Sequence, residues 1–211
     1  MKITVVDAPL IRDELTKMRD KNTGSIAFRK GLVHIGRYFS YEITKSFDWV
    51  EKEVKTPLAA ADGIEIEDMK RVIVINVLRA AMPLVDGLLK VFPEARVGII
   101  SAFRGKAPEF KVSVDYVKVP RISKKDILII ADPMVATGST MVRILKELRK
   151  YGEPKRKIIT CVVTTQYAME KIEKESPDAE VYTAVIDPEI NERGYIVPGL
   201  GDAGDRAFRN E

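Results

Sequence analysis

The sequence predicts an α/β fold with a mostly parallel central sheet flanked by helices. Its aliphatic runs of strand length, such as VIVINVL at residues 72–78, lack the alternation of half-exposed strands and are typical of strands covered on both faces. From residue 71 onward these runs alternate with segments of helical periodicity, which is the order of right-handed βαβ units.

The elements follow from periodicity and from the residues that end each segment. Apolar residues at helical spacing predict a helical N-terminal region over residues 1–50, and residues 50–59 alternate like a strand that ends near a proline. In the α/β core, residues 71–187, we expect strands at 72–78, 96–103, 126–132, 157–165 and 181–187, and helices at 83–92, 140–152 and 166–175. The tail, residues 188–211, completes a single domain. Its stretch 194–204 has too much glycine and proline for the interior of a helix or strand.

The composition narrows the class of protein. The chain has 211 residues, 45% of them hydrophobic, which suits one globular domain with a sizeable core. Its net charge of +4 is mild, and no aromatic residues interleave with the basic clusters, so we expect no nucleic-acid partner. No apolar run reaches the length of a membrane span, and no signal peptide is visible. With Cys161 as a single, buried thiol, these features predict a cytoplasmic protein that binds no membrane.

Ligands of a parallel sheet bind at the carboxyl ends of its strands. At one of these ends, the segment ADPMVATGST at residues 131–140 has an acid, a glycine and three hydroxyl residues between a buried strand and a helix. The glycine, the hydroxyls and the free N–H groups of the first helical turn would bind a phosphate. Asp132 would instead accept hydrogen bonds from two adjacent sugar hydroxyls. The segment therefore predicts a ribose 5-phosphate site.

Other interpretations of this segment are weaker. It matches neither GxxxxGK[ST] nor GxGxxG, and we expect no lysine to reach the loop. An ordinary strand-to-helix connection with a capping Ser or Thr would explain one hydroxyl, but not three together with a glycine after a lone acid.

These residues resemble the fingerprint of the phosphoribosyltransferases that use phosphoribosyl pyrophosphate (PRPP). Most of them have two adjacent acids before the loop, whereas this chain has Ala131 and then Asp132, and its DPMVATG form is similar to uracil phosphoribosyltransferases. The tail segment GYIVPGLGDAGDRAF, residues 194–208, is similar to the uracil-binding segment of that family, and IDPEIN before it fits as well. The resemblance implies a type I phosphoribosyltransferase fold with a base-binding hood at the C-terminus. It also implies transfer of the phosphoribosyl group from PRPP to N1 of uracil, giving UMP and pyrophosphate.

The resemblance implies roles for individual residues. Backbone groups of the tail would match the C=O, N–H and C=O edge of uracil, and Arg79 and Arg104 would each contact the pyrophosphate. Residues expected to bind PRPP are Arg79, Arg104, Asp132, Pro133, Met134, Val135, Ala136, Thr137, Gly138, Ser139, Thr140 and Asp202, and those expected to bind uracil are Ile196, Gly201, Asp202 and Ala203. Mg²⁺ is the expected cofactor, held mainly by PRPP oxygens and waters, with Asp202 contributing through a water and no firm protein ligand.

Further expectations concern regulation and assembly. The archaeal branch of the family is regulated by GTP, and the matching nucleotide stretch is Lys30, Gly31, Leu32, Val33 and His34; a basic helix face explains these residues equally well. We expect a homo-oligomer, a dimer or a tetramer, for which the helical region 1–50 has enough apolar positions. The polar segment 105–120 reads as a β-ribbon or mobile flap, with a plain surface hairpin as the alternative.

Some questions stay open at this point. Asp187 and Glu189 could form a general acid–base pair, but a turn with capping acids explains them more simply. No general base for uracil N1 stands out. A phosphoribosyltransferase for another base, a non-enzymatic regulator that binds pyrimidine nucleotides and RNA, and a generic nucleotide-binding module are the alternatives to this function.

Overall fold

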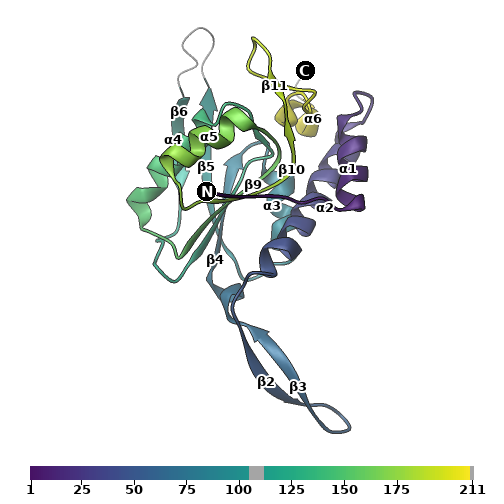
Figure 1. Cartoon of the computed structure of the whole chain (residues 1–211), viewed down its shortest axis with the longest axis vertical. Helices are drawn as coiled ribbons and strands as arrows, with labels where there is room; N and C mark the ends of the chain where they lie inside the picture. The colour runs from purple at the N-terminus through teal and green to yellow at the C-terminus, as the bar shows by residue number, and fades with distance from the viewer. Residues whose placement is uncertain (105–111, 210–211) are drawn as a thin grey trace.

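The computed structural model describes residues 1–104 and 112–209 of the chain. A central β-sheet has helices on both faces, and a long two-stranded hairpin projects from the end of the molecule opposite the C-terminal tail (Figure 1). The strands are β1 (Lys2–Val5), β2 (Trp49–Lys55), β3 (Ala60–Ile66), β4 (Val72–Leu78), β5 (Arg96–Arg104), β6 (Val112–Lys118), β7 (Ile127–Ala131), β8 (Met134–Val135), β9 (Arg156–Thr165), β10 (Glu180–Asp187), β11 (Glu189–Ile190) and β12 (Ile196–Val197). The helices are α1 (Pro9–Arg19), α2 (Ser25–Thr44), α3 (Met82–Leu89), α4 (Ser139–Leu148), α5 (Gln166–Glu175) and α6 (Ala203–Phe208), with short 3₁₀ segments η1 (Glu67–Arg71) and η2 (Arg149–Tyr151).

The main sheet has the strand order β1-β10-β9-β7-β4-β5-β6, with β8 paired to β9. All of these neighbours are parallel except β6, which runs antiparallel to β5. The predicted α/β fold is therefore confirmed. The five core strands and the three helices are also confirmed, and only their end residues differ from the predicted ones. The strand order reverses between β4 and β7, so the chain segments that follow these two strands emerge side by side at the carboxyl edge. Parallel sheets bind ligands at such a reversal.

Helices α2 and α3 pack closely on one face of the sheet. Their contact passes through two glycines, because a β carbon on Gly36 would lie 2.3 Å from the carbonyl oxygen of Leu84 and one on Gly87 would lie 2.2 Å from that of Val33. The apolar side chains of α2 that face inward, such as Phe28, are fully buried. Helices α4 and α5 cover the opposite face (Figure 1), and no helix in the described ranges is both long enough and apolar enough to span a membrane.

Three predictions of local structure were wrong. Residues 2–5 form strand β1 rather than helix, because they pair with β10, a partner 178 residues away at the Lys2–Glu180 register that no local pattern could indicate. Strand β3 was not predicted, although its partner β2 was. In the glycine-rich tail, β12 and the start of α6 form inside the stretch 194–204; the side chain of Asp202 caps α6 by accepting the N–H of Asp205 at 2.9 Å.

The prediction for the single cysteine is confirmed. Cys161 is buried, and burial raises the pKa of its thiol to about 12.

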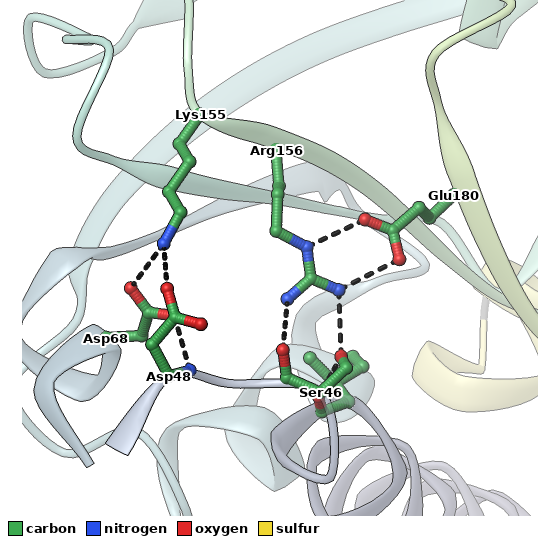
Figure 2. Close-up of polar contacts among 7 residues, drawn as sticks. Ser46, Asp48, Asp68, Lys155, Arg156 and Glu180 are labelled. Carbon is green, nitrogen blue, oxygen red and sulfur yellow. Dashed lines mark hydrogen bonds and ion pairs between the residues drawn. The ribbon is translucent and has the colours of Figure 1, made fainter. Parts of the chain in front are cut away.

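The base of the β2–β3 hairpin is tied to the start of β9 by two neighbouring groups of polar contacts (Figure 2). In the first, the ammonium of Lys155 pairs with Asp48 and, at 3.3 Å, with Asp68. Asp68 is 6% exposed and also accepts the backbone N–H of Asp48 at 3.0 Å. Since Asp48 precedes β2 and Asp68 follows β3, this group joins both ends of the hairpin to the sheet.

The second group centres on Arg156. Its guanidinium donates to both carboxylate oxygens of Glu180, at 2.7 and 2.8 Å, and to the hydroxyl of Ser46 at 2.9 Å (Figure 2). The same guanidinium lies 5.7 Å from the ring centroid of Phe47. Arg156 therefore joins β9, β10 and the end of α2, and it fixes the direction in which the hairpin leaves the body.

Candidate active site

A cavity of about 230 Å³ opens at the carboxyl edge of the sheet. Three segments that are distant in sequence line it: Ala80, two residues after β4, the loop from β7 into α4, and the C-terminal tail. Predicted site residues on its wall are Asp132, Met134, Val135, Ala136, Thr137, Gly138, Thr140, Ile196, Gly201, Asp202 and Ala203. The structure thus brings the predicted phosphate loop and the predicted uracil segment together around one space.

Two threonine side chains of β9 hold the loop between β7 and α4 by hydrogen bonds to its backbone carbonyls. The hydroxyl of Thr164 donates to the carbonyl of Val135 at 2.9 Å, and that of Thr165 donates to the carbonyl of Ala136 at 2.7 Å. Thr165 is also the N-cap of α5, where its hydroxyl accepts the N–H of Ala168. These contacts fix the loop backbone, so the N–H groups of the first turn of α4, which have no intrahelical acceptor, face the cavity in a set geometry.

Gly138 occupies a position that only glycine fits well. Its φ of +70° is in the left-handed region, and a β carbon would lie 2.9 Å from the carbonyl oxygen of Ala168 on α5. The sequence predicted that glycine keeps space open for a phosphate. The structure adds that it also permits the contact between the loop and α5.

Asp132 is the carboxylate of this loop. It is partly buried and accepts the N–H of Met134 at 3.3 Å. Burial raises the pKa of Asp132 to about 7, an effect that the Met134 N–H only partly offsets. In the described part of the chain no cation pairs with it, so hydrogen-bond donors from a ligand would stabilise its ionised form. This is the environment expected for a carboxylate that takes sugar hydroxyls.

The tail is held over the cavity by a buried acid. Asp187, 3% exposed, accepts the guanidinium of Arg19 at 2.7 Å and the backbone N–H of Gly199 at 2.9 Å. Both oxygens are engaged away from the cavity, and Glu189 is an exposed residue of β11. The two acids therefore do not form a catalytic pair. The preferred alternative, a turn with capping acids, is wrong for Asp187, which ends β10 and caps no described helix.

Arg206 fastens the tail to the N-terminal helices, a role that the sequence did not suggest. Its guanidinium donates to the carbonyls of Met18, Leu200 and Asp20, and lies 4.4 Å from the ring centroid of Phe28. The carbonyl groups it satisfies belong to the end of α1, the loop after it and the tail itself. The N-terminal helices therefore act as the support on which the tail rests.

Of the two predicted pyrophosphate arginines, Arg79 is not on the cavity wall. Arg79 directly follows β4, is half-exposed, and its guanidinium lies 3.6 Å from the carboxylate of Asp205 on α6. A salt bridge, which is the commoner reason for an arginine at a strand end, is therefore present. Its neighbour Ala80 lines the cavity. Arg104 ends β5, and its side chain lies outside what the structure describes.

The remaining predicted residues lie around this site or far from it. Pro133 is buried below the loop, and Ser139 begins α4 beside the cavity. The predicted flap falls partly outside the described residues, at 105–111; the part that follows forms β6, antiparallel to β5, as a ribbon requires. Cavity residues outside the predicted set of site residues are Ala80, Met141, Gly194, Tyr195 and Gly204. Four of these five are glycine, alanine or methionine, whose side chains carry no distinctive chemistry.

The predicted GTP stretch lies on α2. Gly31 and Leu32 are buried, and a β carbon on Gly31 would meet Met18 at 2.7 Å. His34 is exposed, and its Nδ1 lies 2.9 Å from a carboxylate oxygen of Glu14. The five residues are thus consecutive on one helix, and only part of the stretch faces solvent.

Comparisons with known proteins cover almost the whole chain. The family model described as "Uracil phosphoribosyltransferase" matches residues 5–210. A uracil phosphoribosyltransferase from Thermococcus gammatolerans is 56% identical over 202 residues, covering 96% of this chain and 90% of the relative. One from Pyrococcus furiosus is 52% identical, covering 96% of this chain and 87% of the relative. The solved structure of the AQ2163 protein from Aquifex aeolicus superposes with a TM-score of 0.90 at 29% identity, covering 99% of each chain.

These matches extend from the N-terminal helices to the tail, so they include all three segments that line the cavity. Relatives more than half identical carry one name, and the lone acid and the glycine-rich tail belong to the same chain-long match. The chain therefore belongs to the uracil phosphoribosyltransferase family, pentosyltransferases that transfer the phosphoribosyl group of PRPP to N1 of uracil to give UMP and pyrophosphate.

Proposed function

We propose that this transfer takes place in the cavity between the β7–α4 loop and the tail. The observation that carries the proposal is that these two segments, separated by more than fifty residues, line one space. In it, Asp132 takes the ribose hydroxyls, and residues 137–140 take the 5-phosphate at the N-terminus of α4. The backbone around Ile196 and residues 201–203 takes the edge of uracil.

The proposed mechanism relies on positioning and on charge. N1 of uracil attacks the anomeric carbon of PRPP as the bond to pyrophosphate breaks, through a transition state with oxocarbenium character, and the N1 proton is released to water. Fixed backbone groups of the tail would orient uracil without a charged side chain. Cytosine reverses two of the three polar groups along this edge, so its binding would leave buried groups unpaired.

Arg79 and Arg104 are proposed to stabilise the pyrophosphate as it leaves. Arg79 follows β4, at the point where the strand order reverses, and its contact with Asp205 is half-exposed. Exposed pairs of this kind contribute little to stability, so a bound pyrophosphate could replace Asp205 as the partner at small cost.

Mg²⁺ is proposed as the cofactor, and when bound it would neutralise charge on the pyrophosphate. Two carboxylates line the cavity, Asp132 and Asp202, and one oxygen of Asp202 accepts the N–H of Asp205. A Mg²⁺ ion takes few protein carboxylates and keeps several waters, so this donor set fits an ion held mainly by PRPP, with Asp202 contributing through a water. Removing divalent cations with a chelator should abolish turnover, and added Mg²⁺ should restore it.

A homo-oligomer, either dimer or tetramer, is also proposed. Most apolar residues of α2 are used in the core, although Ile26 and Tyr41 are exposed. The β2–β3 hairpin exposes Leu58 by 97%, Ile64 by 60% and Trp49 by 55%. A two-stranded hairpin is marginal by itself, so contact with a second copy would stabilise it. Light scattering on the wild-type protein and on an Ile64→Ser, Leu58→Ser variant tests this, with a smaller particle expected for the variant.

GTP is proposed as an activator that binds the exposed face of α2. Lys30, His34 and Arg37 are exposed at helical spacing on that face, which would favour an anionic nucleotide. Turnover measured with and without GTP, in the wild type and in a Lys30→Met, Arg37→Met variant, tests the proposal. A GTP response that is equal in both proteins would remove α2 as the site.

One assay tests the catalytic proposal as a whole. UMP formation from uracil, PRPP and Mg²⁺ should be lost or strongly reduced in an Asp132→Ala variant that retains the wild-type melting curve. A panel of bases, with cytosine, hypoxanthine and orotate beside uracil, should show product with uracil alone. Full activity of the variant would show that the cavity is not where the ribose binds.

A further inference from the structure

Among the described residues that line the cavity, two have carboxylate side chains and none has a cationic one. The two are Asp132 and Asp202. The proposed ligand of the loop is a 5-phosphate that is largely dianionic at neutral pH. Backbone N–H groups and hydroxyls can bind the phosphate, but the two carboxylates repel its charge. A cation near the loop would offset this repulsion.

Lys171 supplies such a cation from α5. Its ammonium donates to the hydroxyl oxygen of Ser139, the first residue of α4, at 2.7 Å, and the side chain is partly buried. It also lies 5.9 Å from the ring centroid of Tyr167. The sequence indicated that no lysine reaches the loop, which is wrong: the lysine comes from the next helix, 32 residues beyond Ser139.

The packing of α5 explains why Lys171 reaches this point. Ala168 lies against Gly138, where a β carbon on the glycine would meet its carbonyl oxygen at 2.9 Å. Lys171 is three residues further along the same helix, so it lies on the same face as Ala168. The close approach that Gly138 permits therefore also brings the lysine to the start of α4.

The hydrogen bonds around Ser139 define which way its hydroxyl can donate. Its oxygen accepts from the ammonium of Lys171 at 2.7 Å and lies 3.2 Å from the hydroxyl of Thr137. An ammonium has donors only, so the proton of Ser139 points away from Lys171, either to Thr137 or to an acceptor at the N-terminus of α4. A phosphate oxygen at the N-terminus of α4 would be that acceptor, and the ammonium would strengthen the bond by polarising the hydroxyl.

We propose that Lys171 is a positioning residue for the 5-phosphate: it directs the Ser139 hydroxyl toward the phosphate and compensates part of its charge. The proposal rests on the proposed binding of the phosphate by residues 137–140. It makes Lys171 a determinant of selectivity for ligands that carry the 5-phosphate. Since the phosphate is remote from the anomeric carbon, its contacts are the same in the ground state and the transition state. Loss of Lys171 should therefore raise KM and leave kcat unchanged.

Three variants of α5 test the proposal. Lys171→Met removes the charge and keeps most of the length, Lys171→Arg keeps the charge, and Lys174→Met removes an exposed lysine of the same helix as the matched control. Calorimetry with UMP should give a dissociation constant about tenfold higher for Lys171→Met, as expected for a charge-assisted hydrogen bond. The dissociation constant should stay within about threefold of the wild-type value for Lys171→Arg, because arginine keeps a charged donor. It should be unchanged for Lys174→Met. The KM for PRPP should follow the same order while kcat stays constant, and the salt dependence of UMP binding should become shallower in Lys171→Met.

Two outcomes would overturn the proposal. Wild-type UMP affinity and PRPP KM in Lys171→Met would remove the lysine from phosphate binding. Equal losses in Lys171→Met and Lys171→Arg, with a lowered melting temperature in both, would show a packing role only. A Ser139→Ala, Thr140→Val variant separates this failure from that of the phosphate site: if it also binds UMP normally, the loop does not bind the phosphate. If it weakens UMP binding while Lys171→Met does not, the lysine proposal alone fails.

Discussion

Gly138 and Ala168 approach so closely that a β carbon on the glycine would lie 2.9 Å from the carbonyl oxygen of Ala168. This contact connects the two helices that carry the proposed phosphate site, because Gly138 precedes α4 and Ala168 is in the first turn of α5. The loop is therefore a packed part of the fold as well as a surface for a ligand.

A side chain at position 138 should consequently destabilise the protein as well as block its ligand. The sequence alone predicted only that this glycine helps to bind a phosphate. We now expect Gly138→Ala to lower the free energy of unfolding by about 1–3 kcal/mol, from the left-handed φ and the contact with Ala168. Gly24→Ala is the control, since a β carbon there meets nothing within 4 Å. Denaturant unfolding measures both, and equal midpoints for the two variants would contradict this account of the loop.

Asp132→Asn should stabilise the protein while it weakens PRPP binding. Burial raises the pKa of Asp132 from its ordinary value of 3.8 to about 7, so the folded wild type binds a proton that the unfolded chain has lost between these pH values. The contribution of Asp132 to stability is thus lost as pH rises from about 4 to 7. The asparagine variant lacks this loss, and its advantage in unfolding free energy should grow over that range to a few kcal/mol.

The same variant should bind PRPP on the order of tenfold more weakly, because an ionised acceptor is replaced by a neutral one. Unfolding measured at pH 5 and pH 8, together with a PRPP titration at pH 8, checks both effects. A stability difference that does not change with pH would mean that Asp132 is not held in a poorly hydrated environment.

Arg206→Met should impair uracil use through the tail. The substitution leaves the carbonyls of Met18, Leu200 and Asp20 without their donor, so we expect a loss of about 2–4 kcal/mol in unfolding free energy or a local release of the tail. The KM for uracil should rise more than the KM for PRPP. Arg143→Met, which alters an exposed arginine of α4, is the control. Equal changes in the two KM values would argue against a selective effect on the tail.

Arg156→Met should loosen the hairpin without touching the cavity. It removes the donors to Glu180 and Ser46 seen in Figure 2 and leaves a partly buried carboxylate unpaired. Loss of one partner of a fully buried ion pair lowers the free energy of unfolding by about 3–5 kcal/mol. Because Arg156 and Glu180 are partly exposed, we expect roughly half of that loss here. If the hairpin joins two copies, the apparent mass in light scattering should become concentration-dependent. An unchanged melting temperature would show that the network does not support the hairpin.

The α/β core could be predicted from the sequence because its signals are local. Strands β4, β7 and β9 are covered on both faces and therefore lack alternation, and the helices between them have clear periodicity and end at glycine or a loop. The loop after β7 and the tail could be predicted as site segments for a related reason: glycine and hydroxyl residues at a strand end have few structural explanations.

What the sequence could not predict depends on partners distant in the chain. Strand β1 exists because β10 offers an edge, Lys171 reaches Ser139 because α5 packs under Gly138, and Arg206 meets carbonyls of α1 from the opposite end of the chain. Lys171 and Arg206 have no local pattern that distinguishes them from an ordinary surface lysine or arginine. The β-branched run at residues 3–6 does favour a strand, but it does not indicate the distant partner. Arg79 shows the opposite case, since the resemblance implied an anionic ligand for it, and the structure provides Asp205.

The central claim is that the β7–α4 loop and the tail bind the two halves of one nucleotide. A crystal structure of the complex with UMP tests it most directly. The account predicts the 5-phosphate at the N-H groups of residues 137–140, the ribose hydroxyls at Asp132, and the uracil edge against the backbone of Ile196 and residues 201–203. UMP bound with its phosphate away from the N-terminus of α4, or with its base outside the tail, would contradict it.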